Sequence, residues 1–117
     1  MRRDWDLVRE ILIQVGESVD PLEILDVVGT GYPMNDIAHH FYILKDAGLL
    51  EIEMRRGVEH SYDPVAIQLT WQGNELLDAI IDLRSWENLK TVAEERGVPL
   101  SLDFIKTLAA RALDKMP

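Results

Sequence analysis

Residues 32–70 decide the fold of this chain, and their sequence is YPMNDIAHHFYILKDAGLLEIEMRRGVEHSYDPVAIQLT. In the first part of this stretch, apolar side chains recur at the i, i+4, i+7 spacing of one helix face: Ile37, Phe41 and Leu44. This spacing predicts an amphipathic helix with a buried apolar stripe. We expect Asn35 to cap its N-terminus. Gly48 should end it, because glycine adopts the left-handed conformation of a helix C-terminus without strain.

The second part of the stretch changes to a period of two, which is typical of strands. Apolar and polar residues alternate over residues 50–55, pause in the polar loop of residues 56–64, and alternate again over residues 65–70. The residues expected to point inward are Leu50, Ile52, Met54, Val65, Ile67 and Leu69, and Ala66 is expected to point outward. A helix followed at once by a two-stranded hairpin predicts a winged helix-turn-helix domain in which the hairpin is the wing.

Two helices are predicted ahead of this stretch. The first runs from about Asp4 to Glu17, with Asp4 as its cap. Its apolar stripe comprises Trp5, Val8, Ile11, Leu12 and Val15. Pro21 then opens a short helix of residues 22–28, since proline is tolerated in the first turn. The inward residues of this second helix are expected to be Leu22, Leu25 and Val28. Three helices in this order predict the helix-turn-helix core.

Three more helices are predicted after the hairpin, each opened by a capping hydroxyl. Thr70 caps a helix from Trp71 to about Leu83, Ser85 caps a second helix that ends at Gly97, and Ser101 caps the last one. The inward residues expected on the first two are Leu76, Leu77, Ile80, Trp86, Leu89 and Val92.

The expected fold class is α+β, mostly α. It consists of a winged-helix core of residues 1–83 and a helical C-terminal extension of residues 84–117, which together form one structural domain. The last helix carries a wide apolar stripe: Phe104, Ile105, Leu108 and Ala112. This stripe either covers helices of its own chain or forms a homodimer.

The composition narrows the class of protein. The chain has 117 residues and 47% hydrophobic content, which suits one compact domain. It contains no cysteine, and this excludes disulfides, thiolate metal sites and a cysteine nucleophile. No run approaches the roughly 18 apolar residues of a membrane span. We expect no signal peptide in the N-terminal sequence MRRDWDLVRE, because aspartates follow its arginines. We expect a cytoplasmic protein without a membrane partner.

The charge opposes the expectation that a winged helix binds nucleic acid. Asp and Glu total 21 and Lys and Arg total 12, so the formal net charge is −9. Affinity for DNA depends mainly on cations that neutralise phosphates. Residues 21–48 contain four carboxylates and only one cation, Lys45. Architecture and charge therefore favour different partners.

Several segments resemble a phage and prophage protein family of unknown function. They are Arg3-Asp4-Trp5-Asp6-Leu7-Val8-Arg9, then His40…Leu44…Ala47-Gly48-Leu49, then Leu69-Thr70-Trp71…Gly73…Leu76-Leu77-Asp78, and finally Trp86 with the amphipathic last helix. The resemblance implies a winged-helix core and an origin in a mobile element. It implies no catalytic or binding residues, because no activity is assigned to the family.

The first functional hypothesis is a DNA-binding transcriptional regulator that reads duplex DNA with the helix of residues 32–48 and the wing. If Ile37, Phe41 and Leu44 point inward, then His39, Tyr42, Ile43 and Asp46 point outward. The candidate DNA contacts are His39, Tyr42, Lys45, Arg55 and Arg56. A dimer would repeat this footprint over two half-sites.

The second hypothesis is an acidic module that binds and inhibits or modulates a host protein that acts on nucleic acid or in defence. Its carboxylates would take the place of phosphates, and Tyr42 and Ile43 would be its apolar anchors. The candidate residues are Asp36, Tyr42, Ile43, Asp46, Glu51, Glu53 and Glu59. A third reading is that the same helix face packs against the C-terminal helices of its own chain.

The sequence indicates no enzyme, no cofactor and no metal site. His39 and His40 diverge by about 100° on a helix, whereas helical zinc ligands prefer i, i+4 spacing. His40 lies at the edge of the buried stripe, where we expect it to hydrogen-bond a neighbouring element. Gly29-Thr30-Gly31 lacks the lysine and the preceding strand of a phosphate-binding loop.

Overall fold

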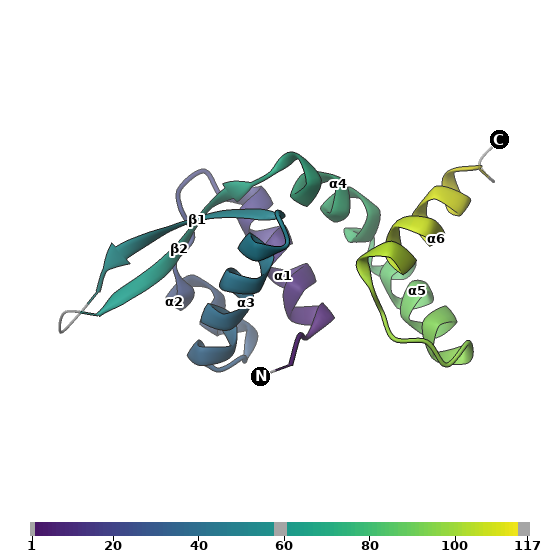
Figure 1. Cartoon of the computed structure of the whole chain (residues 1–117), viewed down its shortest axis with the longest axis horizontal. Helices are drawn as coiled ribbons and strands as arrows, with labels where there is room; N and C mark the ends of the chain where they lie inside the picture. The colour runs from purple at the N-terminus through teal and green to yellow at the C-terminus, as the bar shows by residue number, and fades with distance from the viewer. Residues whose placement is uncertain (1, 58–60, 115–117) are drawn as a thin grey trace. The chain divides into compact units, whose positions relative to one another are not determined.

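The computed structural model describes residues 2–57 and 61–114, apart from the side chains of Val28 and residues 110–114. The chain divides into two compact units, residues 1–75 and residues 76–117. The elements are α1 (Trp5–Glu17), α2 (Ile24–Val27), the 3-10 turn η1 (Val28–Thr30), α3 (Met34–Asp46), β1 (Leu50–Arg56), β2 (Tyr62–Leu69), α4 (Trp71–Ile80), α5 (Leu83–Glu95) and α6 (Leu102–Asp114) (Figure 1). The boundary between the units falls inside α4.

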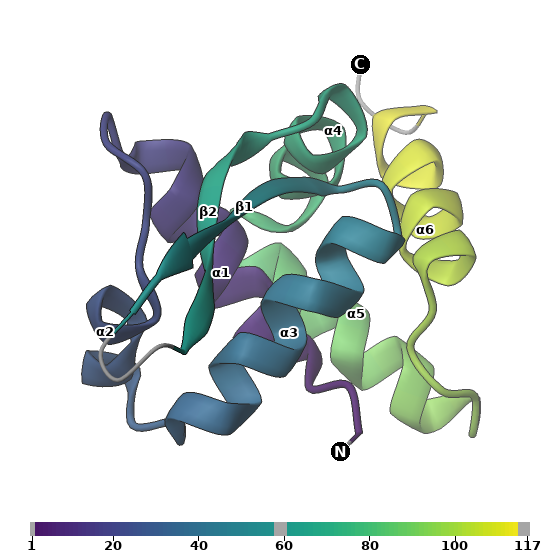
Figure 2. The same cartoon turned by 60° about the vertical axis from the view of Figure 1, so that its left-hand side comes forward.

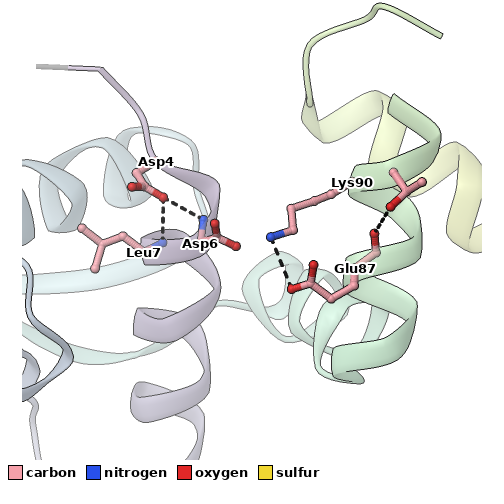
Figure 3. A network of polar contacts seen from close by, with 6 residues as sticks. Asp4, Asp6, Leu7, Glu87 and Lys90 are labelled. Carbon is pink, nitrogen blue, oxygen red and sulfur yellow. Dashed lines mark hydrogen bonds and ion pairs between the residues drawn. The ribbon is translucent and has the colours of Figure 1, made fainter. Parts of the chain in front are cut away.

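Helix α1 begins at the predicted cap. The Asp4 carboxylate accepts the backbone N–H groups of Asp6 at 2.9 Å and Leu7 at 3.2 Å (Figure 3). These bonds satisfy two donors of the first turn that have no partner within the helix. The buried residues of α1 are Leu7, Val8, Ile11, Leu12 and Val15, so the predicted stripe is confirmed except that Leu7 is buried and Trp5 is half-buried.

The short second helix starts later than predicted. Leu22 is extended and forms an antiparallel bridge with Ala66. The Leu22 N–H donates to the Ala66 carbonyl at 2.8 Å, and the Leu22 carbonyl accepts the Ala66 N–H at 2.9 Å. Because both backbone groups of Leu22 are used in this pairing, the helix begins at Ile24. Ile24 and Val27 are then the buried residues. The prediction that Leu25 points inward is wrong, since it is 65% exposed, and the Val28 side chain lies outside the described residues.

Helix α3 packs against the hairpin, and α1 contacts both (Figure 2). The predicted apolar stripe of α3, which comprises Ile37, Phe41 and Leu44, is buried. The N-cap is Pro33 and makes no side-chain capping bond, so the prediction that Asn35 caps this helix is wrong. Pro33 is extended and precedes the first turn, so Asn35 lies two residues after the cap position, inside the first turn of the helix. Gly48 ends the segment with a φ of 76°, as predicted.

The hairpin pairs β1 with β2 in antiparallel fashion. Leu50 lies opposite Leu69, but the register then shifts so that Ile52 lies opposite Ala66. Ile67 is therefore an extra residue in β2, a β-bulge that exchanges the two faces of the strand beyond it. The prediction that Ala66 points outward is wrong: Ala66 is fully buried. Met54, predicted to point inward, is 43% exposed.

A close junction joins the hairpin to its neighbours. The Thr70 hydroxyl donates to the Gly48 carbonyl at 2.6 Å and accepts the Gly73 N–H at 3.0 Å, so the predicted cap of α4 is confirmed. The Thr70 N–H donates to the Leu49 carbonyl at 3.1 Å. A Cβ atom on Gly73 would lie 2.0 Å from that same carbonyl oxygen. Only glycine allows this approach of α4 to residue 49.

The second unit is helical. Leu76, Leu77 and Ile80 of α4 are buried as predicted, although α4 ends at Ile80 rather than near Leu83. The cap of α5 is Asp82 and not Ser85, because the Asp82 carboxylate accepts the Ser85 N–H at 2.8 Å. Within α5, Lys90 Nζ lies 3.4 Å from Glu87 Oε1 and forms an ion pair with it (Figure 3). The buried residues of α5 are Trp86, Leu89 and Ala93, and Val92 is only half-buried.

The start of α6 is as predicted. The Ser101 hydroxyl accepts the Phe104 N–H at 3.1 Å, and Ile105 is fully buried. Phe104 and Leu108 are half-buried, and the Ala112 side chain lies outside the described residues.

The fold is α+β and mostly helical, with one two-stranded antiparallel sheet in the part of the chain that the structure describes. The order of elements is compatible with a winged helix-turn-helix. Over the described residues, every helix is too short or too polar to cross a lipid bilayer.

Candidate binding face on α3 and the hairpin

One buried histidine links α3 to the residue before α1. His40 is 2% exposed, its Nε2 accepts the Asp4 N–H at 2.8 Å, and its Nδ1 donates to the Asp36 carbonyl at 2.7 Å. Because Nε2 must be an acceptor here, these bonds require the neutral imidazole with its proton on Nδ1. The expected hydrogen bond to a neighbouring element is confirmed. His40 thus ties α3 to the residue that caps α1.

The outward face of α3 carries the residues predicted from its periodicity. Tyr42, Lys45 and Asp46 are exposed, and Asp36, His39 and Ile43 are half-buried. Asn35 is exposed as well, at i−7 from Tyr42 and therefore on the same face. The sequence analysis did not place Asn35 on this face because it interpreted the side chain as a helix cap.

This face continues onto β1. The Tyr42 hydroxyl lies 3.7 Å from the Met54 sulfur, and these side chains are 39% and 43% exposed. The contact brings an aromatic ring of α3 and a flexible thioether of the hairpin together at the surface. We call the outward residues of α3, together with the exposed residues of β1, the candidate binding face, or binding face for short. Its residues on α3 are Asn35, Asp36, His39, Tyr42, Ile43, Lys45 and Asp46.

The described residues of the hairpin include one ion pair, between Arg55 and Glu53. Arg55 Nη2 lies 3.3 Å from Glu53 Oε2, and both side chains are about half exposed, at 48% and 59%. Glu51 accepts the side-chain N–H of Gln68 at 2.6 Å. Arg56 is exposed. Glu59 and His60 lie outside the described residues.

The binding face is acidic in sum. Its candidate cations are Lys45, Arg55 and Arg56, and its described candidate carboxylates are Asp36, Asp46, Glu51 and Glu53. The pairing of Arg55 with Glu53 further lowers the positive field that the hairpin presents.

A second polar cluster consists of Tyr32 and the carboxylates of Asp4 and Asp6 at the start of α1. Burial, and then the negative charges of Asp4 and Asp6, raise the pKa of Tyr32 above its ordinary value. Tyr32 is therefore protonated at neutral pH. The Arg3 guanidinium lies 4.6 Å from the centre of the Trp5 ring, a cation–π contact.

The described residues contain no group of three His, Asp or Glu side chains that could hold a metal ion. The rings of His39 and His40 meet edge to face with centroids 5.7 Å apart. Both nitrogens of His40 already have backbone partners, so this pair does not converge on an ion.

Residues 2–99 match the model of a hypothetical-protein family, DUF2513. The chain belongs to this family. An uncharacterized protein of Haemophilus influenzae is 38% identical to it over 118 residues, which cover 99% of this chain and 98% of the relative. No solved structure matches the chain. The expected membership of a family of unknown function is confirmed.

The DUF2513 match covers every described helix and strand of the chain except the last helix. It contains α1 to α5 and therefore the whole binding face, but it ends before α6 begins at Leu102. The binding face thus lies within the region that defines DUF2513, whereas the last helix lies beyond it.

Proposed function

We propose that this DUF2513 protein is a winged helix-turn-helix transcriptional regulator of phage or prophage origin that binds duplex DNA through α3 and the hairpin. The observation that carries the proposal is the placement of α3 against the hairpin, with Tyr42 in contact with Met54. The Leu22–Ala66 bridge supports it, because it ties the segment before α2 to the side of β2 that faces away from β1. The resemblance of residues 3–9 to phage and prophage proteins supports the origin.

The proposed contacts divide into two kinds. Asn35, His39 and Tyr42 occupy the outward face of α3, from which side chains reach base edges in a major groove. An exposed asparagine here can bond adenine through two hydrogen bonds. Lys45, Arg55 and Arg56 would contact phosphates, and Arg55 would exchange Glu53 for a phosphate oxygen.

A salt titration of duplex binding tests this function. With three phosphate contacts, the logarithm of the affinity should fall with the logarithm of salt at a slope of about −2.7. The variants Arg55→Gln and Arg56→Gln should each reduce this slope by about 1. Arg84→Gln, which removes an exposed cation from the other unit, is the matched control and should leave the slope unchanged. Absence of binding to a pool of random duplexes at low salt would refute the proposal.

A second function is favoured by a specific observation, the pairing of Arg55 with Glu53 on a face that already has more carboxylates than cations. In this alternative the protein is an acidic module that binds a host protein which acts on nucleic acid or in defence. The carboxylates of Asp36, Asp46 and Glu51 would occupy its phosphate-binding site, and Tyr42 and Ile43 would anchor the complex.

Capture from a nuclease-treated host lysate tests the second function. Ile43→Asp should abolish capture of a nucleic-acid-binding protein, because it places a charge among the anchors. Leu25→Asp is the matched control, since Leu25 is 65% exposed and lies on α2, outside the binding face. If Ile43→Asp and Leu25→Asp reduce capture equally, the result contradicts this function.

A further inference from the structure

Strand β1 is an edge strand. In the described part of the chain the sheet has the order β1–β2, and the other side of β2 carries the bridge to Leu22. The free side of β1 is therefore the edge at which another strand can be added to this sheet.

The hydrogen bonds of β2 determine which groups of β1 point to this edge. Both backbone groups of Ala66 bond to Leu22, so the pair Ile52–Ala66 has no hydrogen bonds of its own. Met54 lies opposite Pro64, which has no N–H to donate. The N–H and carbonyl groups of Ile52 and Met54 consequently point away from β2. Along β1, the backbone groups of alternate residues point to β2. Gly57 belongs to the alternate set that points to β2, and its N–H donates to the Ser61 carbonyl at 2.7 Å.

The charges along β1 reverse sign at Met54. Glu53 and Arg55 flank it, share one face of the strand and are exposed. If a second β1 runs antiparallel along the edge with Met54 opposite Met54, each Glu53 lies opposite Arg55 of the second copy. These would be non-hydrogen-bonded pairs, in which opposite side chains are closest. A register centred on Glu53 would instead place two carboxylates opposite each other, so the charges select the first register.

We propose that two copies of this chain associate through β1, edge to edge and antiparallel about Met54, to form a four-stranded sheet. The occupant of the edge is a second copy because the sequence from Glu53 to Arg55 is complementary to itself in this register. The inference goes beyond the proposed function, since it depends on neither DNA nor a host protein. It also differs from a homodimer through α6. Because a single strand pair is a small interface, the dimer should dissociate in the micromolar range.

Sedimentation equilibrium of the full chain at low salt tests the proposal. The unmodified protein should show a monomer–dimer equilibrium. Arg55→Glu converts two attractive pairs into two repulsive ones and should raise the dimer dissociation constant by about tenfold or more. The double exchange of Glu53→Arg with Arg55→Glu restores opposite charges in the same register and should restore the dimer. Lys45→Glu is the control, because it makes the same change in net charge on α3 and should leave the dimer intact.

A backbone substitution tests the edge itself. Met54→Pro removes an N–H that points to the edge and not to β2, so the hairpin should keep its own bonds. Its circular dichroism should match that of the unmodified protein, while the dimer is lost. The proposal is overturned if the unmodified chain remains monomeric up to about 1 mM, far above the micromolar range expected for such an interface. It is also overturned if the dimer persists in folded Arg55→Glu and Met54→Pro variants, or if the double exchange fails to restore it.

Discussion

At the scale of single residues, the first unit depends on polar contacts between segments that are far apart in the chain. His40 bonds the N–H of Asp4, which is 36 residues away. This bond holds α3 in the same rotation about its axis as the burial of Ile37, Phe41 and Leu44 does. Asn35 and Tyr42 point outward in that rotation.

Replacement of His40 by leucine should lower the free energy of unfolding by about 1–3 kcal/mol, since it leaves the Asp4 N–H without its acceptor in a partly buried position. Urea denaturation followed by circular dichroism measures this loss. His39→Leu, one residue away on the half-buried side of the helix, should change stability by no more than about 0.5 kcal/mol. Equal losses in the two variants would show that the His40 hydrogen bonds do not stabilise the fold.

Gly73 provides a second residue-scale prediction. Gly73→Ala should lower the free energy of unfolding by about 1–3 kcal/mol, because the added Cβ collides with backbone that is already bonded to Thr70. Gly29→Ala is the matched control, as no atom lies within 4 Å of the Cβ position there. If urea midpoints of the two variants agree, α4 does not approach residue 49 as closely as the structure indicates.

At the scale of elements, helix ends were predicted well where a hydroxyl or carboxylate directly precedes an apolar stripe. Asp4, Thr70 and Ser101 cap α1, α4 and α6 as expected. The prediction failed at α5, because the cap is Asp82 and not Ser85, and the helix begins three residues before the predicted start. Two competing caps within one turn cannot be ranked from local sequence, because their difference in free energy is small.

The α5 cap gives a prediction with a pH dependence. The N–H of Ser85 bonds the Asp82 carboxylate and lowers its pKa below the ordinary value of 3.8. A lowered pKa in the folded state means that the stabilisation is complete above about pH 4 and is lost as pH falls through the lower, folded-state pKa. Asp82→Asn keeps a capping oxygen that cannot titrate. The difference in unfolding free energy between the unmodified protein and Asp82→Asn should therefore become smaller as the pH is lowered from about 5 through the folded-state pKa of Asp82.

Denaturant titrations at a series of pH values check this dependence. Asp103→Asn alters an exposed carboxylate of the first turn of α6 and serves as the control. A difference between the unmodified protein and Asp82→Asn that stays constant with pH would contradict the cap.

At the scale of the whole molecule, the net charge of −9 affects stability as well as binding. Like charges repel one another in the compact state, and salt screens this repulsion over roughly 10 Å at 0.1 M. The melting temperature of the monomer should therefore rise as sodium chloride increases from about 0.02 to 0.2 M. Calorimetry at a concentration below the dimer dissociation constant measures it. A melting temperature that falls with salt would mean that favourable ion pairs outweigh the repulsion.

Much of the helical fold could be predicted because the signals are local. The stripes of α1 and α3, the glycine that ends α3 and the two strands all follow from periods of 3.6 and 2 and from turn residues. The candidate face could be predicted in the same way, since burial of Ile37, Phe41 and Leu44 leaves only one direction for Tyr42. The role of these face residues stays a prediction, because periodicity specifies exposure and not the partner.

By itself, the sequence determined the order of helices and strands, the buried stripe of α3 and the acidic character of its outward face, because each depends on residues within a few positions of one another. Only the tertiary structure decided that Leu22 is extended and pairs with Ala66, that a bulge at Ile67 buries Ala66, and that Asn35 is exposed on the binding face. The physical reason is the distance between partners. A backbone bond between residues 22 and 66 competes with local helix formation, and it prevails only once α1, α3 and the hairpin have packed together.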